Sequence, residues 1–414
     1  MPSLPSDHSR SLELRRSYYP FLLGFIAISF QILILREFEA SLLANELVYG
    51  LVLAFWLLGS SLGSWLVKKS IPARFSPSGM YYSVLILFVI LLVWLRFFRP
   101  LAGYLPAEAA GFFPVLIISF LISIFLSFPL GALFVANVHW SDGQLLRVYQ
   151  LESLGSAAGG LVVYLFLIPY FSNWQAAAVV ILLISLAIAL ASSSWKTRAT
   201  GFFVCLLALS LWLFDFPSQK VTWQPFELLA SRDSIYSRLQ VIKSEEQYSF
   251  YSNSLLVFNY PDPQLAEDLV CFSVLQRPQA KNILLIGGGL NGSLELLLAC
   301  PEVEVDYVEL DPEIIELTRH YLPPAAAVLT DPRLTSYIED GRHFIRRTDH
   351  SYQIIICNLP EPSSAQINRF YTVEFFALVK EKLLPDGVFS FIVPSSENYI
   401  SSEQAELLAS LYYS

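Results

Sequence analysis

The chain is poor in cysteine, histidine and charge, and each shortage excludes a class of site or partner. Its four cysteines are scattered and form no C-x-x-C pair, which argues against a disulfide framework and against a zinc site. The five histidines do not pair at ligand spacing, so we expect no metal. Charged residues make up only 15% of the chain and the net charge is −9, which argues against a nucleic-acid partner.

Apolar sequence is in excess, and it is concentrated in the first half. Hydrophobic residues make up 55% of the 414 residues, and long apolar runs dominate up to about residue 217. We therefore predict a membrane half, followed by a soluble half of roughly 195 residues that can bury its own core. Residues 1–17 are polar and lack signal-peptide features, so we expect a mobile tail there. Residues 18–216 predict an all-α membrane bundle, with seven spans of about the required length: 18–35, 47–67, 80–98, 112–136, 153–171, 174–192 and 199–215.

Some residues of the membrane half are polar or small in ways that lipid contact does not explain. An ionisable residue in a span is a candidate for function, although we favour an interfacial position for those found here. The polar residues are Gln31, Arg36, Glu37 and Glu46. Two G-x-x-x-G pairs predict close helix packing rather than a substrate path: Gly59 with Gly63, and Gly155 with Gly159.

Basic residues are unevenly divided between the two ends of the expected spans. The opposite end has only Arg36, Arg96 and Arg99, so the positive-inside rule places the N-terminus in the cytoplasm. Seven spans would then put the soluble half outside, away from cytosolic nucleotides. We favour a span count that is wrong by one, and the side of the soluble domain stays open. The expected localisation is integral and multi-pass, in a bacterial-type cell membrane. The basic residues on the N-terminal side are Arg10, Arg15, Arg16, Lys68, Lys69, Arg74, Arg147, Lys196 and Arg198.

Residues 282–311 contain the strongest functional signal. An apolar run of strand length leads into a glycine turn, a helix-like stretch at 293–299 and a second strand at 303–308 that ends on Glu309. This is the pattern of a βαβ nucleotide-binding unit. Glycines let the backbone approach a ligand, the helix start offers free N–H groups, and Glu309 can accept both hydroxyls of a ribose. The turn glycines are Gly287, Gly288, Gly289 and Gly292. Their G-x-G-x-x-G match leaves NAD open, as well as a turn that binds nothing.

The rest of the second half predicts a doubly wound α/β domain behind a small β-hairpin module. Alternating residues 234–258 predict the hairpin, with a turn at 252–254, and residues 261–276 a helix. Further strands are expected at 334–338, 352–357 and 388–393, with helices at 342–347 and 372–384 and a turn at 385–387.

Polar residues follow successive predicted strands, where the carboxyl ends of a parallel sheet line one crevice. They suit an adenosine-type ligand beside a second substrate: Glu309, Asp340 with Gly341, and then Asn358 and Glu361. The alternative for each acid is an N-cap of the next helix. We expect caps at Asp311 and Thr372, and favour a site role for Asp340.

The second half resembles the spermidine synthase (polyamine aminopropyltransferase) family, which has a methyltransferase-like fold. The motifs are I-G-G-G-x-x-G, V-E-L-D-P at 308–312, E-D-G-R at 339–342, residues 358–362 and R-F-Y-T-V-E-F-F at 369–376. Other motifs resemble the membrane-fused branch of that family: Q-I-L-I-L-R-E in the first span, L-E-S-L-G-S-A-A-G-G at 151–160, E-Q-Y-S-F-Y-S-N at 246–253, A-E-D-L-V at 266–270 and E-N-Y at 397–399.

The resemblance implies S-adenosylmethionine, or its decarboxylated form, as co-substrate and a polyamine such as putrescine as acceptor. Glu309 would hold the ribose, Asp340 with Gly341 the adenine, and the glycine loop the donor's tail. Asn358 with Glu361 would hold the acceptor as the catalytic pair, with Glu267 and Tyr371 as further substrate-binding candidates. Asn358 stands where the family has its proton-accepting aspartate, and Glu361 matches a second acidic position. Leu290 and Ser237 also depart from the family pattern. Nucleotide binding is therefore better preserved than aminopropyl transfer.

The sequence thus predicts a tail at 1–17, a membrane domain at 18–216, a linker with the hairpin module at 217–280 and a nucleotide domain at 281–414. Further strands are expected after the fifth, so the C-terminus looks truncated, or a homo-oligomer or partner chain completes the sheet. The expected function is aminopropyl transfer. Two alternatives stay open, a methyltransferase and a non-catalytic transporter or sensor that binds a nucleoside.

Overall fold

The chain forms two compact units, Met1–Pro225 and Phe226–Ser414. The computed structural model describes residues 7–42, 45–67, 76–360, 362, 364–393 and 400–413, with the backbone alone at 7–16 and 403. Glu361 and the E-N-Y motif at 397–399 lie outside these residues.

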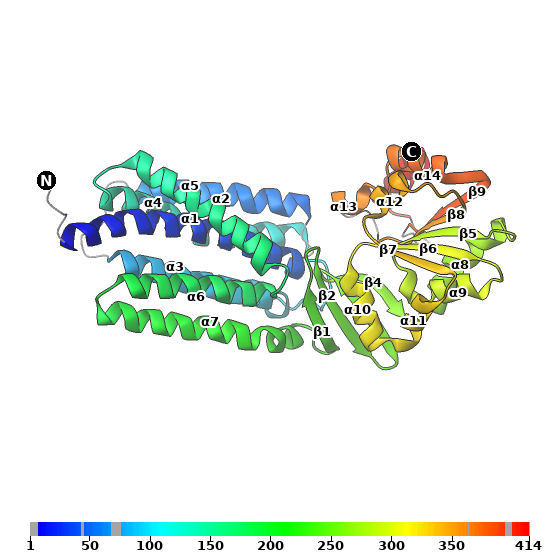
Figure 1. The fold of residues 1–414 in the computed structure, drawn as a ribbon, viewed down its shortest axis with the longest axis horizontal. Coiled ribbons are helices and arrows are strands. Elements are labelled where there is room, and N and C mark those ends of the chain that lie inside the picture. Colours follow the sequence, from blue (N-terminus) through cyan, green and yellow to red (C-terminus); the bar gives the residue numbers. More distant parts are fainter. Residues whose placement is uncertain are drawn as a thin grey trace. The chain divides into compact units, whose positions relative to one another are not determined.

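Among the described residues, seven helices are long and apolar enough to cross a membrane (Figure 1). They are α1 Asp7–Leu42, α2 Glu46–Val67, α3 Pro77–Leu101, α4 Phe112–Trp140, α5 Leu145–Val162 with its π-helical continuation Val163–Leu167, α6 Asn173–Ala191 and α7 Trp195–Thr222. The expected error in the span count is therefore not found.

The first and last of these helices are longer than expected. The polar stretch that predicted a mobile tail is helical from Asp7, since nothing between Asp7 and Pro20 breaks a helix. Helix α7 continues through Pro217 to Thr222 instead of ending at 215. The turn around Pro217 is held from outside, because Arg96 binds both Asp215 and Ser218.

The G-x-x-x-G pairs bring helices into close contact, as predicted. A Cβ added at Gly63 of α2 would lie 2.0 Å from the backbone oxygen of Phe128 in α4. One added at Gly155 of α5 would lie 2.0 Å from that of Phe21 in α1. Only glycine permits this backbone approach.

Glu37 does not extend outward from the bundle towards lipid headgroups, as snorkelling would require, but is fully buried in an ion cluster. Its carboxylate pairs with Arg96 at 2.8 Å, and Arg96 also binds Asp215 at 2.5 Å. Asn173 donates to Glu37 at 2.8 Å, and the Arg96 guanidinium lies 3.7 Å from the centre of the Trp174 ring. The cluster joins α1, α3, α6 and α7, since buried charges are stable only when they are paired.

The C-terminal unit begins with a four-stranded antiparallel sheet, larger than the expected hairpin. Its strands pair in the order β1-β2-β3-β4, and Asn253 and Ser254 form the expected turn with positive φ. They are β1 Glu227–Asp233, β2 Arg238–Ser244, β3 Gln247–Ser252 and β4 Leu255–Tyr260.

A five-stranded parallel sheet follows, in the order β7-β6-β5-β8-β9. Alternate residues of β5 enter two different hydrophobic cores, Ile283 and Leu285 on one face and Leu284 and Ile286 on the other, so both faces are covered. The strand order reverses at β5, which is where doubly wound sheets bind ligands. The strands are β5 Asn282–Ile286, β6 Glu304–Glu309, β7 Leu334–Ile338, β8 Tyr352–Cys357 and β9 Leu383–Phe391.

Short helices connect these strands: α8 Pro263–Gln276, α9 Ser293–Ala299, α10 Pro312–Tyr321, α11 Pro323–Ala327, α12 Gly341–Arg347, α13 Ala365–Asn368, α14 Val373–Lys382 and α15 Ser402–Tyr413. The expected turn at 385–387 lies inside β9. Pairing passes from Tyr352 with Leu383 to Ile354 with Val388, so residues 384–387 bulge out of the ladder.

Candidate functional site

A cavity of about 100 Å³ lies at the carboxyl ends of β5, β6 and β7. It brings together Gly287, Glu309, Asp340 and Gly341 of the expected nucleotide site. Its remaining walls are mainly apolar. They come from the ends of β5 and β6 and from residues that follow β8 in the chain. The full lining is Ile286, Gly287, Val308, Glu309, Leu310, Asp340, Gly341, Leu359, Gln366, Ile367, Arg369 and Phe370.

The glycine turn needs its glycines for both conformation and space. Gly287, Gly288 and Gly292 have φ of +71°, +56° and +114°, where a side chain would be strained. A Cβ on Gly289 would lie 2.9 Å from the Tyr307 ring, so this glycine permits packing against β6. Gly341 has the same role in α12, because a Cβ there would lie 2.5 Å from Ile286. Gly288, Gly289 and Gly292 do not line the cavity.

Glu309, at the end of β6, is held in place by its hydrogen bonds. Its carboxylate accepts from the Tyr307 hydroxyl at 2.9 Å and from the backbone N–H of Leu310 at 2.8 Å. The side chain is buried, and burial raises its pKa although these hydrogen bonds lower it. A buried carboxyl at this place favours a ligand that brings hydroxyl donors, because these would stabilise its charged form.

Asp340 is both an N-cap and a cavity residue, so the two alternatives considered for it do not exclude each other. One carboxylate oxygen caps α12 by accepting from the His343 N–H at 2.9 Å. The other accepts from the guanidinium of Arg369, which also lines the cavity. Asp311 and Thr372 cap α10 and α14, as expected.

Asn358 and Leu290, the two departures from the family's acidic pattern, both face protein rather than open space. The Asn358 amide donates to the backbone oxygen of Gly288 at 2.9 Å. Leu290 is buried in the core on the β5 face that also holds Leu285. Neither position therefore presents a carboxylate to a substrate.

The described residues that are expected to bind the acceptor do not line the cavity that holds Glu309 and Asp340. Tyr371 is buried, and its hydroxyl donates to the backbone oxygens of Leu359 and Pro360 at 3.4 and 3.3 Å. Glu267 is exposed on α8 and does not line the cavity. Glu361 lies outside the described residues.

Three contributors to the site were missed by the sequence analysis. Tyr307 orients Glu309 from the same strand, and a two-residue spacing along a strand could have indicated it. Arg369 lies within the R-F-Y-T motif but was given no role. The Ser234 hydroxyl donates to Asp311 at 2.5 Å, which ties the antiparallel sheet to the start of α10. These two residues are 77 positions apart, so no local pattern could have found the contact.

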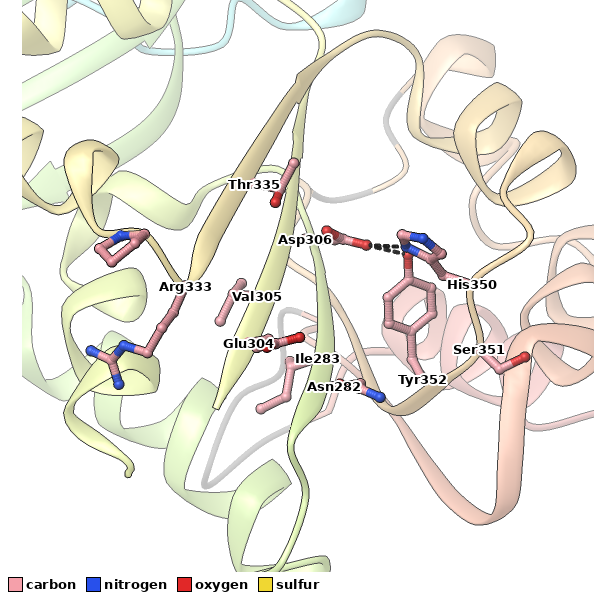
Figure 2. A pocket seen from close by; sticks show the side chains of 11 residues that line it. Asn282, Ile283, Glu304, Val305, Asp306, Arg333, Thr335, His350, Ser351 and Tyr352 are labelled. Carbon is pink, nitrogen blue, oxygen red and sulfur yellow. Dashed lines mark hydrogen bonds and ion pairs between the residues drawn. The ribbon is translucent and has the colours of Figure 1, made fainter. Parts of the chain in front are cut away.

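A larger groove, of about 460 Å³, lies at the opposite, amino ends of the parallel strands. Figure 2 shows its centre, where His350 and Tyr352 point at Asp306, with hydrogen bonds of 3.0 and 2.7 Å. These bonds link the start of β8 to β6. We assign the site to the smaller cavity, because ligands of doubly wound sheets bind at the carboxyl ends. The described residues contain no group of three or more metal-ligating side chains.

Comparison with known proteins identifies the second unit. A family model described as "Spermine/spermidine synthase domain" matches residues 263–404. A polyamine aminopropyltransferase of Clostridium perfringens is 30% identical over 185 residues, which cover 44% of this chain and 65% of that protein. One of Oceanobacillus iheyensis is 27% identical over 262 residues, covering 58% of this chain and 50% of that protein. The chain thus spans less than two thirds of these relatives' length.

Solved structures of spermidine synthases are also similar. That of Thermotoga maritima is 26% identical, with 40% of this chain and 56% of that chain covered and a TM-score of 0.36. A spermidine synthase in complex with the transition-state analogue AdoDATO is 26% identical, with 40% and 57% covered and a TM-score of 0.38. By the family model and the curated relatives, the second unit is similar to the spermidine synthase (polyamine aminopropyltransferase) family, and the seven long apolar helices that precede it fit a membrane-fused form of that family.

Proposed function

We propose that this chain is a membrane-bound aminopropyltransferase, with decarboxylated S-adenosylmethionine as donor and an amine such as putrescine as acceptor. Similarity of the second unit to the spermidine synthase family supports this reaction class. The observation that carries the proposal is that Gly287, Glu309 and Asp340, from three different strand ends, line one cavity.

In the proposed complex, Glu309 accepts hydrogen bonds from the two ribose hydroxyls, and Asp340 with Gly341 holds the adenine. The donor's tail runs along the glycine turn. The acceptor lies near Asn358 and Glu361, with Glu267 and Tyr371 as further contacts. The chain's task is to hold the amine in line with the carbon beside the sulfonium, because orientation is the main contribution a protein can make to such a displacement.

A second candidate, methyl transfer from S-adenosylmethionine, has one observation in its favour. Leu290 is buried and Asn358 is neutral and bound to the glycine turn, so two carboxylates that would suit a dicationic acceptor are absent. An uncharged methyl acceptor has no need of them.

We also propose a setting for the enzyme. It is an integral, multi-pass protein of a bacterial-type cell membrane, with the lipid bilayer as partner and no nucleic-acid partner. A second copy, or another chain, pairs with the open edge of β9, because an uncovered edge strand tends to recruit another strand.

The full chain purified in detergent tests the proposal. Calorimetry should detect both sulfonium nucleosides and no NAD. Mass spectrometry after incubation with decarboxylated donor and putrescine should detect spermidine and methylthioadenosine in equal amounts. Binding of NAD alone would overturn both transferase candidates. Methylated product with no aminopropylated amine would select the second candidate.

A further inference from the structure

Asn358 is fixed to the glycine turn by both its backbone and its side chain. Its N–H donates to the backbone oxygen of Ile286, the last residue of β5, at 2.9 Å. Its side-chain amide donates to the backbone oxygen of Gly288, also at 2.9 Å. The residue therefore joins the end of β5 to the middle of the turn.

The contact leaves no free space between Asn358 and the turn. A Cβ on Gly288 would lie 2.5 Å from the Asn358 side-chain nitrogen, and one on Gly287 would lie 2.9 Å from its backbone oxygen. Because the partner is a carbonyl oxygen, which only accepts, the group facing it has to be a donor. A carboxylate in this place would face the Gly288 carbonyl oxygen, acceptor against acceptor, and lose the bond.

Described titratable groups nearby are also unsuited to accept a proton from a substrate. Burial raises the pKa of the neighbouring Cys357 thiol to about 12. Burial likewise raises the pKa of Tyr371, whose hydroxyl already donates to two backbone oxygens. Glu309 and Asp340 are engaged by Tyr307 and Arg369. Leu290, the other departure, carries no charge.

We propose that Asn358 is a positioning residue that holds the glycine turn in its ligand-binding conformation, and that the acceptor amine reacts as the free base, without a proton acceptor from position 358. This rests on the proposed aminopropyl transfer. The lone pair of the neutral amine forms the new C–N bond while the C–S bond breaks. Its electron pair stays on sulfur, which becomes a neutral thioether, and the product ammonium then loses a proton to solvent.

A pH–rate profile tests the chemical half of the proposal. Since only the unprotonated amine reacts, kcat/KM of the unmodified chain should rise about tenfold per pH unit between about pH 7 and 9, towards the acceptor's own pKa. With Asn358→Asp, the rise should flatten, because a carboxylate then takes the proton. A flat profile in the unmodified chain would mean that another group accepts the proton, and would overturn this half.

Binding of methylthioadenosine tests the positioning half without any turnover. Asn358→Asp and Asn358→Ala should each weaken its binding about tenfold, the effect of one lost hydrogen bond, and speed amide exchange at Gly288. Asn282→Asp is the matched control, since it adds the same charge at an exposed position at the start of β5. Unchanged affinity and exchange in both Asn358 variants would overturn the positioning role. Absence of transfer to any amine would overturn the proposed function instead.

Discussion

At the scale of single residues, the ribose-binding role proposed for Glu309 comes with a cost in stability. Burial raises its pKa, so the folded chain binds this proton more tightly than the unfolded chain does. The protonated Glu309 carboxyl therefore stabilises the fold fully at pH values below its pKa in the unfolded chain. This stabilisation is lost as pH rises through its pKa in the folded chain. In the ligand-free protein, the charged form of this carboxyl is destabilised by burial, and ribose hydroxyls would stabilise it.

We expect Glu309→Gln to raise the melting temperature of the ligand-free chain by about 2–4 °C at pH 7.5 and to abolish nucleoside binding. The gain should disappear near pH 4.5, where the unfolded carboxyl is protonated. Scanning fluorimetry over this range measures it, with the exposed Glu304→Gln on the same strand as control. A lower melting temperature at pH 7.5 would contradict the argument.

Two substitutions of Asp340 distinguish its role as the N-cap of α12 from its proposed role in nucleoside binding. Asparagine caps helices as well as aspartate does, so Asp340→Asn should leave stability nearly unchanged while nucleoside affinity falls about tenfold. Asp340→Ala loses the cap as well, at a cost of about 1 kcal/mol. The ion pair with Arg369 is partly exposed and adds little to either value. Equal stability of the two variants would show that the cap does not matter.

The strand-end rule could predict that Glu309 and Asp340 share a cavity, but not how each is held. The two-residue spacing along β6 could indicate Tyr307 beside Glu309. Arg369 reaches Asp340 from 29 positions away, through side-chain geometry that a motif does not contain. The bond between Asn358 and Gly288 joins residues 70 positions apart and depends on how β8 is placed beside β5. Such contacts follow from the folded sheet and not from local spacing.

At the scale of elements, two glycines of the N-terminal unit, one in a close helix contact and one in open space, allow the packing of helices to be tested. Gly155→Ala puts a methyl group against the Phe21 backbone, whereas Gly50 in α2 has nothing within 4 Å of its added Cβ. We expect Gly155→Ala to cost about 1–3 kcal/mol and Gly50→Ala to be neutral or slightly stabilising. Thermal unfolding in detergent, followed by size exclusion, measures both. Equal melting of the two variants would contradict close packing of α1 on α5.

Periodicity and length predicted every long helix, but not where α1 begins or α7 ends. Polar residues at Asp7 and beyond do not stop a helix, and Pro217 is accommodated because partners from another helix hold its turn. The bulge in β9 could not be predicted either, since it arises from pairing with β8. Hydrophobic pattern therefore gave the elements, while their boundaries depended on tertiary contacts.

At the scale of the whole molecule, basic residues of the connecting segments are found at one end of the seven helices only, once buried arginines are left out of the comparison. Arg96 and Arg99 are buried within α3 and are not loop charges. The connections on that side, residues 43–45, 102–111 and 168–172, contain no lysine or arginine. If all seven helices span a membrane, we expect from the positive-inside rule that Phe226–Ser414 lies on the non-cytoplasmic side, where the donor would have to be supplied.

Labelling with a membrane-impermeant maleimide tests this topology. In a Cys205→Ala, Cys300→Ser background, exposed Cys271 should react in intact spheroplasts, while buried Cys357 stays silent. Ser193→Cys, exposed between α6 and α7, should react only after permeabilisation. Reaction of Cys271 only after permeabilisation would place the C-terminal unit in the cytoplasm.

The cluster around Arg96 also implies an order for biogenesis. Helices leave the ribosome in sequence, so Glu37 and Arg96 are available to neutralise each other before Asp215 has been synthesised. When α7 arrives, the Asp215 carboxylate pairs with the Arg96 guanidinium of α3, which is already in place. We therefore expect the last helix to join the bundle after the first and third, because both described ion pairs of this cluster share the one guanidinium of Arg96.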